Sequence, residues 1–92
     1  MGCACAQIVR SLAGHDRGGR FCGRDTDGPY LLLCEGKRRK LENPKRKRAF
    51  HTAPAGDFQH PVLDQLRTGG NLSNRDIRRA LAAFRAEELR RV

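Results

Sequence analysis

Basic side chains dominate the part of this sequence whose residue types and spacing could do chemistry. Two clusters, KRRK at residues 37–40 and KRKR at residues 45–48, hold eight Lys and Arg residues, and Glu42 is the only acidic residue between Lys37 and Arg48. Each Lys or Arg that contacts a phosphate releases condensed counterions, so dense positive charge favours a polyanion. Surfaces that only keep a protein in solution mix both signs of charge, which these clusters do not.

The whole chain shares this bias. Its 92 residues carry nineteen Lys and Arg against ten Asp and Glu, a formal net charge of +9. This length suits one small domain with an appendage rather than an enzyme with a deep cleft, so we expect no catalytic residues and no small-molecule substrate. Nucleic acid is the first partner that such an excess of positive charge favours. A nuclear-import signal would fit KRRK and KRKR too, but it would not explain the strand-like residues beside them.

A second segment, AGHDRGGRF at residues 13–21, combines glycine with charge. It could be the phosphate-binding loop of a nucleoside triphosphatase, a turn in a small β-barrel or a flexible link. The phosphate-binding loop requires G-x-x-x-x-G-K-[ST] before a helix, whereas this loop leads to Phe21 and a strand-like run. We therefore predict a barrel turn, with Arg17 and Arg20 directed toward the same polyanion as the basic clusters. Its expected structural glycines are Gly14, Gly18 and Gly19.

The cysteines and histidines lack the spacing of a metal site. Cys3 and Cys5 are one residue apart, while Cys22 and Cys34 lie in apolar runs, where cysteine acts as a small hydrophobe. We predict free thiols in a reducing compartment, with no metal and no cofactor; a site built from all four thiolates is the alternative. The three histidines are expected to be polar surface residues: His15, His51 and His60.

The chain has no apolar run as long as a membrane span and no secretory signal at its N-terminus. The N-terminal acylation pattern requires a hydroxyl residue at position 6, which is Ala6 here. We therefore expect a cytoplasmic protein with no membrane partner.

Short strands and tight turns are predicted for the first half of the chain. Asp27-Gly28 is a strong hairpin signal, and Pro44 requires an edge or a bend. The expected strands are residues 7–12, 21–25, 30–34, 37–41 and 45–50. Because closure removes exposed edges, these strands predict a mainly β fold, a small closed or nearly closed barrel. Its expected core is Ile8 or Val9, Leu12, Phe21, Leu31, Leu33, Leu41 and Phe50.

A helix is predicted for residues 72–92. Ser73 and Asp76 have capping-box spacing, and Leu72 and Ile77 are placed as a hydrophobic staple. One stripe of the helix is apolar, formed by Ile77, Ala80, Leu81 and Phe84. The opposite side is basic, with Arg75, Arg78, Arg79 and Arg85. Since a lone helix of this length is marginal, the stripe should pack on the barrel, on a second copy or on a partner. The expected order is a tail (1–5), a barrel (6–52), a linker with a short helix over 62–67 (53–71) and the helix (72–92).

The segment IVRSLAGHDRGGRF resembles the KOW motif, in which a strand leads through a glycine-containing basic loop into a second strand. Together with the tract DGPYLLLCEGKRRKLENPKRKRAFHT, it is similar to small bacterial KOW-domain RNA-binding proteins, related to KOW-bearing large-subunit ribosomal proteins of archaea and eukaryotes. The resemblance implies an SH3-like β-barrel that binds ribosomal RNA or assists translation without catalysis. Gly14 and Arg17 match the motif's loop, whereas Ala6 and Cys22-Gly23 depart from the usual pattern.

These observations predict an RNA-binding protein, ribosomal or ribosome-associated, whose partners are ribosomal RNA and ribosomal proteins. Aromatic residues are few, and only Tyr30 and Phe50 lie near the basic clusters, so we expect recognition of RNA backbone and shape. The alternative is an adaptor of transcription or translation that binds proteins through the barrel and the C-terminal amphipathic helix. Charge alone does not separate RNA from DNA. The predicted RNA-binding residues are Arg17, Arg20, Lys37, Arg38, Arg39, Lys40, Lys45, Arg46, Lys47, Arg48, Arg75, Arg78 and Arg79.

Overall fold

The structure, a computed structural model, describes residues 6–90. The predicted tail with Cys3 and Cys5, and the last two residues of the predicted helix, lie outside the described residues. The elements in chain order are β1 (Ile8–Ser11), β2 (Arg20–Asp27), β3 (Tyr30–Cys34), β4 (Lys45–Arg48), the 3-10 turn η1 (Ala49–His51), β5 (Thr52–Pro54), α1 (Pro61–Arg67) and α2 (Asn74–Arg90).

The five strands form one antiparallel sheet with the order β4-β3-β2-β1-β5. Four of the predicted strands are confirmed, but the expected strand over residues 37–41 is wrong, because those residues form a loop. The fifth strand is β5, which spans the predicted boundary between the barrel and the linker at residues 52 and 53. The result is an α+β domain rather than a mainly β fold, since the two helices complete its core.

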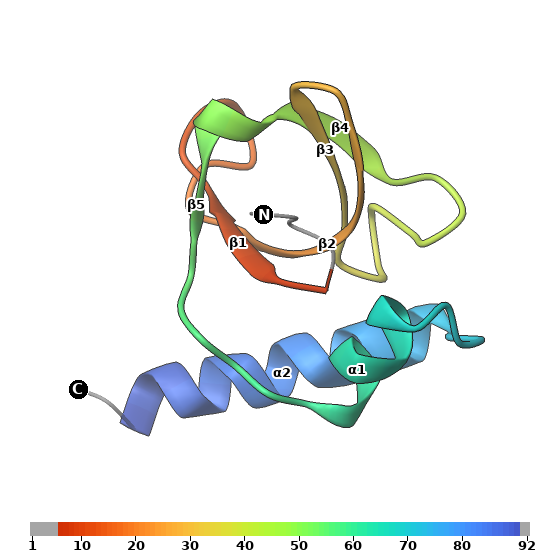
Figure 1. Cartoon of the computed structure of the whole chain (residues 1–92). Coiled ribbons are helices and arrows are strands. Elements are labelled where there is room, and N and C mark those ends of the chain that lie inside the picture. The colour runs from red at the N-terminus through yellow and green to blue at the C-terminus, as the bar shows by residue number, and fades with distance from the viewer. Residues whose placement is uncertain (1–5, 91–92) are drawn as a thin grey trace.

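The sheet curls away from the helices, as Figure 1 shows. Strands β4 and β5 lie at opposite ends of the sheet order, yet only η1 separates them along the chain. A flat sheet of five strands would hold its outer strands about 19 Å apart at the usual spacing. The chain from Arg48 to Thr52 spans at most about 14 Å, so the sheet must bend. Among residues 6–90 no strand pairing joins β4 to β5, so hydrogen bonding leaves the sheet open there.

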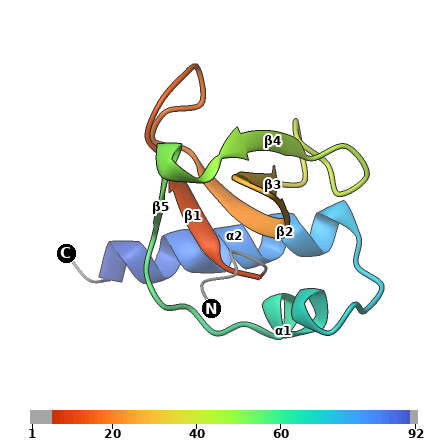
Figure 2. The ribbon, with the colours of Figure 1, turned by 45° about the horizontal axis from the view of Figure 1, so that its top comes forward.

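Each face of the sheet has its own apolar cluster. The face turned toward α1 and α2 buries Ile8, Cys22 and Cys34 against both helices, which lie on the same side of the sheet (Figure 2). The other face, enclosed by the curl, buries a smaller cluster of Val9, Phe21, Leu31 and Leu33. Ile8 and Val9 are therefore both core residues, one on each face, as alternation along a strand requires.

Two predicted core residues are wrong. Leu12 is 41% exposed and Phe50 is 70% exposed. Leu12 follows the end of β1, and Phe50 lies in η1, so neither has the alternating geometry that turns a strand residue inward. Leu41 packs against the helix-side cluster although it belongs to a loop and not to a strand.

The helical predictions hold. The backbone N–H of Ser73 donates to Asp76 Oδ2 at 2.9 Å, and that of Asp76 donates back to Ser73 Oγ at 3.2 Å, which is the reciprocal pattern of a capping box. The apolar stripe of α2 is buried against the sheet of the same chain: Ile77, Ala80, Leu81 and Phe84. Helix α1 begins with Pro61, and His60 Nδ1 caps it by accepting from the N–H of Val62. Neither helix in the described residues is long and apolar enough to cross a membrane.

Candidate nucleic-acid interface

The glycine-rich loop between β1 and β2 is built around the carboxylate of Asp16. Ser11 Oγ donates to Asp16 Oδ1 at 2.9 Å, and Lys47 Nζ lies 3.0 Å from the same oxygen. Lys45 Nζ lies 2.9 Å from the other oxygen, Oδ2. Lys47 also donates to the carbonyl of Ala13 at 2.7 Å, so two lysines of strand β4 fix the position of the loop.

This environment keeps the Asp16 carboxylate ionised over the ordinary pH range. Burial alone would raise the pKa of Asp16, but hydrogen bonds from Lys45, Lys47 and Ser11 outweigh burial and hold that pKa well below its usual value. Asp16 is therefore ionised and neutralised by its two lysines. The turn itself uses Gly14 and Gly18, each with a φ of 86°.

The second basic loop folds around Glu35. One oxygen of this carboxylate, Oε1, accepts the backbone N–H groups of Lys37, Arg38 and Arg39. The N–H of Glu35 in turn donates to the carbonyl of Arg39 at 2.9 Å, which closes the loop. The backbone of KRRK is thus turned inward to an acid, and the side chains of these residues are exposed.

Helix α2 holds the same loop from the other side. Arg78 Nη1 donates to the carbonyl of Gly36 at 2.6 Å, and Asn74 Oδ1 accepts the N–H of Leu41 at 2.7 Å. Asn74 Nδ2 donates to Glu42, and this hydrogen bond lowers the pKa of the Glu42 carboxyl. The start of α2 therefore fixes the loop over residues 36–42 against the sheet.

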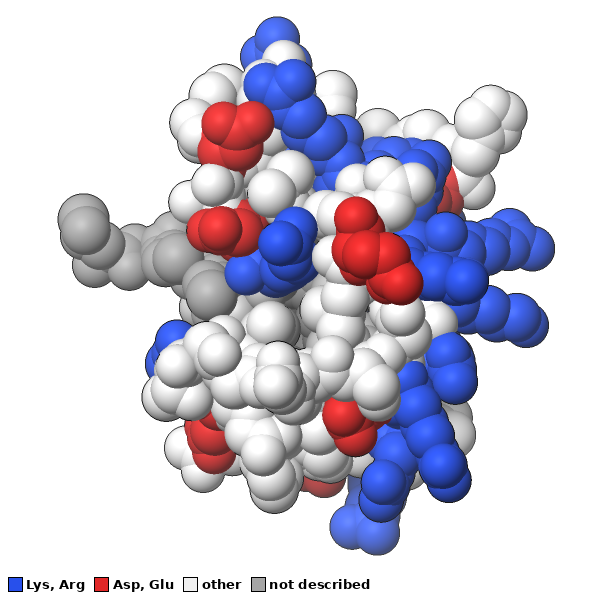
Figure 3. Space-filling model, turned by 90° about the vertical axis from the view of Figure 1, so that its right-hand side faces the viewer, with Lys and Arg blue, Asp and Glu red and all other residues white. Residues whose placement is uncertain are grey.

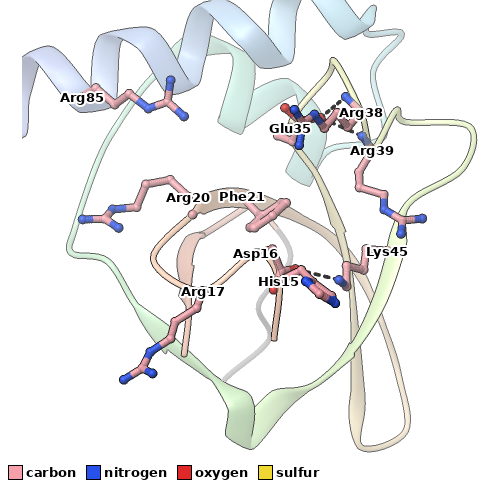
Figure 4. Close-up of a pocket in the computed structure, with 11 residues that line it drawn as sticks. His15, Asp16, Arg17, Arg20, Phe21, Glu35, Arg38, Arg39, Lys45 and Arg85 are labelled. Atoms are coloured by element: carbon pink, nitrogen blue, oxygen red, sulfur yellow. Dashed lines mark hydrogen bonds and ion pairs between the residues drawn. The ribbon is translucent and has the colours of Figure 1, made fainter. Parts of the chain in front are cut away.

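Between the two loops and α2 runs an open groove of about 470 Å³, which we call the arginine groove. Figure 4 shows Phe21 near its centre, with Arg20 and Arg85 on one side and Arg38, Arg39 and Lys45 on the other. The residues that line it are His15, Asp16, Arg17, Gly19, Arg20, Phe21, Glu35, Arg38, Arg39, Lys45 and Arg85.

Among the described residues, some charged groups of the arginine groove already have partners, and others do not. Its two acids are already engaged, Asp16 by lysines and Glu35 by backbone N–H groups. Arg20 is paired with Glu88 of α2 at 3.1 Å. The other arginines have no ion pair with any carboxylate of residues 6–90: Arg17, Arg38, Arg39 and Arg85. The groove is thus a concave surface with four guanidinium groups available to an anion.

The side chains of the KRKR cluster point to two opposite faces of the sheet, because successive residues of strand β4 alternate in direction. Lys45 and Lys47 turn toward Asp16 and the enclosed face, and Lys47 is only 8% exposed. Arg46 and Arg48 turn to the opposite face, where both guanidinium groups lie over the ring of Tyr30. The predicted interface residues of this cluster therefore occupy two different surfaces, and Lys47 lies inside the fold.

The remaining predicted residues lie outside the groove lining. Lys37 and Lys40 are exposed on the loop that Glu35 closes, and Arg75 and Arg79 are exposed on α2. Arg78 is bonded to Gly36. Among the arginines that line the groove, Arg85 is the one missing from the predicted RNA-binding set, although helical periodicity had placed it on the basic side of α2. Figure 3 shows Lys and Arg side chains gathered along one side of the face it displays.

The described thiols are free and buried, as predicted. Cys22 and Cys34 are paired across β2 and β3, and burial raises the pKa of Cys22 to about 12 and that of Cys34 to about 11. Both are therefore neutral thiols at ordinary pH. Residues 6–90 contain no group of three or more His, Cys, Asp or Glu side chains arranged to hold a metal ion. The alternative of a four-thiolate metal site involves Cys3 and Cys5, which lie outside the described residues.

No model of a known protein family matches this chain, and no match was found among curated proteins. The fold and the groove geometry therefore carry the functional argument.

Proposed function

We propose that this protein binds structured RNA through the arginine groove and that it acts by binding and not by catalysis. The observation that carries the proposal is the set of four arginines around one concave surface whose two acids are already engaged, Asp16 by lysines and Glu35 by backbone N–H groups. A guanidinium group forms paired hydrogen bonds with phosphate oxygens, so a concave set of such groups suits a folded phosphate backbone. Ribosomal RNA is the RNA that the KOW resemblance implies, which makes the ribosome the proposed location.

The proposal includes a finer description of the fold, an SH3-like barrel of the KOW type. Its supports are the bend that brings β4 and β5 close enough for η1 to join them, and the glycine-rich loop between β1 and β2. In such a barrel the loop over residues 13–19 lies at one rim. Arg17 and Arg20 then reach the same rim as the loop that carries Arg38 and Arg39.

Binding would be driven by counterion release. RNA phosphates entering the groove replace condensed ions with arginine side chains, and the logarithm of the binding constant then falls linearly with the logarithm of the salt concentration. Phe21 and Gly19 form part of the groove wall, and Gly19, which has no side chain, lets the backbone of the loop approach the RNA closely. Lys37 and Lys40 extend the positive surface beyond the groove.

The test is a salt titration of RNA binding with matched variants. Replacing Arg38, Arg39 and Arg85 together by Gln is expected to lower the steepness of the salt dependence by roughly three and to weaken binding at every salt concentration. The control replaces three exposed arginines outside the groove by Gln, which removes the same net charge: Arg10, Arg67 and Arg90. Equal losses in the two triple variants would contradict a groove-specific interface. A DNA duplex of equal charge tests whether RNA is preferred.

The adaptor alternative loses its main feature. Ile77, Leu81 and Phe84 are buried in the core of the same chain, so a partner could reach the stripe only by displacing the sheet. Association with ribosomal particles is tested separately by gradient sedimentation of a tagged copy at low and moderate salt.

A further inference from the structure

We infer that a second surface, an arginine–aromatic strip on the outer face of β4, stacks unpaired nucleotide bases. The strip consists of Arg46, Tyr30, Arg48 and Phe50, in that order along the surface. The inference rests on the proposed RNA binding and deepens it, since it names the RNA feature recognised: an unpaired base next to a backbone held elsewhere on the protein.

The order of the strip follows from the pairing of β3 with β4. Tyr30 pairs with Arg48 across the two strands, and Arg46 lies two residues before Arg48 on the same face. The Arg46 guanidinium carbon is 4.0 Å from the centroid of the Tyr30 ring. The guanidinium carbon of Arg48 lies between two rings, 5.5 Å from the Tyr30 centroid and 5.9 Å from that of Phe50. Cation and aromatic ring therefore alternate along one continuous surface.

The strip is open to a ligand. Phe50 is 70% exposed, and Arg48 forms no ion pair with a carboxylate of the described residues. Arg46 has an exposed partner, Asp27, at 3.4 Å, and an exposed ion pair of this kind contributes little. Single exposed apolar side chains are ordinary on protein surfaces, but two rings joined by guanidinium groups form a platform.

The chemistry of this platform matches a nucleotide better than it matches a peptide. A base has a flat face that stacks on aromatic rings and on guanidinium planes, and it is attached to a phosphate that requires a cation within one side-chain length. The rings of the strip offer a stacking surface to the base, and the neighbouring arginines offer a cation to its phosphate. An apolar peptide segment would leave Arg48 without an anionic partner and Arg46 with only its exposed ion pair to Asp27.

The location of the strip suits an RNA hairpin. Tyr30 begins β3, and Glu35 of the arginine groove directly follows the last residue of that strand, Cys34. The ends of β3 are on the order of 13 Å apart at the usual rise per residue. Strand β4 is the edge of the sheet, with its lysines toward the groove side and its arginines on the strip. A stem with its phosphates in the groove can therefore cross the β4 edge and lay a loop base on the strip.

The test compares two RNA hairpins that differ only in their loops. One has a loop of unpaired adenosines, and the other has an abasic loop of the same length and therefore the same number of phosphates. We expect the protein to bind the adenosine loop at least about fivefold more tightly, which is the smallest effect expected for one stacked base. The chain contains one Tyr and no Trp, so its intrinsic fluorescence comes from Tyr30 and should be quenched by the adenosine loop only.

Variants then assign the preference to the strip. Replacing Phe50 by Ala and Tyr30 by Leu in one chain is expected to abolish the preference without changing the affinity for the abasic hairpin. Phe50→Ala alone changes an exposed side chain, keeps the fold intact and should already reduce the preference. Leu12→Ala, at an exposed apolar position outside the strip, should leave the preference unchanged.

The outcomes separate this inference from the proposed function. Equal, salt-dependent binding of both hairpins overturns the strip but leaves RNA binding through the groove intact. A preference that persists unchanged in Phe50→Ala also overturns the inference, and the strip then faces another partner such as a protein. The absence of salt-dependent binding to either hairpin overturns the RNA proposal itself.

Discussion

Lys47 Nζ lies 3.0 Å from Asp16 Oδ1 and joins strand β4 to a loop 31 residues earlier in the chain. This lysine belongs to the most basic segment of the protein, yet it is only 8% exposed and donates a second hydrogen bond to the carbonyl of Ala13. A charge in a basic cluster can therefore have an internal role. Here Lys47 fixes the glycine-rich loop and so shapes one wall of the arginine groove.

Acid should weaken this link. The pKa of Asp16 is depressed in the folded protein, so its contribution to stability is fully present above the ordinary pKa of an unfolded Asp, about 4, and is lost as the pH falls below it. We expect the free energy of unfolding to decrease as the pH is lowered from about 5 to about 2. Denaturant unfolding measured across this range would check it.

Asp16→Asn isolates this contribution. Because it leaves Lys47 buried without its anionic partner, the variant should lose roughly 3 kcal/mol of stability at neutral pH. Its stability should also fall less steeply with acid than that of the wild type. Asp57→Asn, at an exposed position of the linker, is the control and should reproduce the wild-type curve. Identical acid dependence in wild type and Asp16→Asn would contradict the assignment.

Lys47 and Arg39 should differ in RNA binding although both lie in the predicted interface. Lys47→Met removes a buried cation, leaves Asp16 with Lys45 and Ser11, and should not change the salt dependence of RNA affinity. Arg39→Met removes a guanidinium group from the groove and should lower that salt dependence by about one. Fluorescence anisotropy titrations at several salt concentrations distinguish the two variants. A reduced salt dependence in folded Lys47→Met would place Lys47 in the interface.

Local sequence patterns were sufficient to predict the structure where it depends on contacts between residues close in the chain. The start of α2 follows from the three-residue spacing of Ser73 and Asp76, and both hydrogen bonds of that pattern form. Residues 37–41 show the limit. Their basic and apolar residues are compatible with a strand. However, the Glu35 side chain accepts three backbone N–H groups that a strand would use for pairing, and the chain forms a loop instead. Hydrophobic periodicity contains no information about such a side-chain hydrogen bond.

The site depends on contacts between distant segments, which the sequence pattern does not contain. KRKR has no apolar residue to mark its inner face, so only the pairing of β4 with Leu31 and Leu33 reveals that Lys45 and Lys47 turn inward. Periodicity put Arg85 on the basic side of α2. Its position across the groove from Arg38 (Figure 4) follows from how the helix packs on the sheet, and that packing is a tertiary property.

Gly36 should tolerate substitution less well than Gly69. A Cβ at this position would lie 2.4 Å from the carbonyl oxygen of Asn74 and 2.9 Å from Arg78 Cγ, so the basic loop could not stay against α2. Gly69 has a similar φ, 79° against 86°, but its Cβ would meet no atom within 4 Å. Both Ala variants carry the same backbone strain of roughly 1–2 kcal/mol.

The difference in unfolding free energy between the two variants therefore measures the steric contact between residue 36 and helix α2. Gly36→Ala should be less stable than Gly69→Ala by about 2 kcal/mol or more in denaturant unfolding, the size of effect that overpacking produces. It should also weaken RNA binding, because Arg38 and Arg39 move with the loop. Equal stability of the two variants would show that the loop is not fixed on α2.

Phe84 and Leu89 test whether the apolar stripe of α2 serves the core or a partner. Phe84 is fully buried and meets Phe58 edge to face, with ring centroids 5.3 Å apart, whereas Leu89 is 77% exposed. Phe84→Ala should therefore cost about 3–5 kcal/mol of stability, and Leu89→Ala should change it by less than about 0.5 kcal/mol. If the stripe were instead a docking surface for another protein, Phe84→Ala would leave the unfolding free energy of the isolated chain unchanged. Denaturant unfolding of the purified variants decides between these two roles.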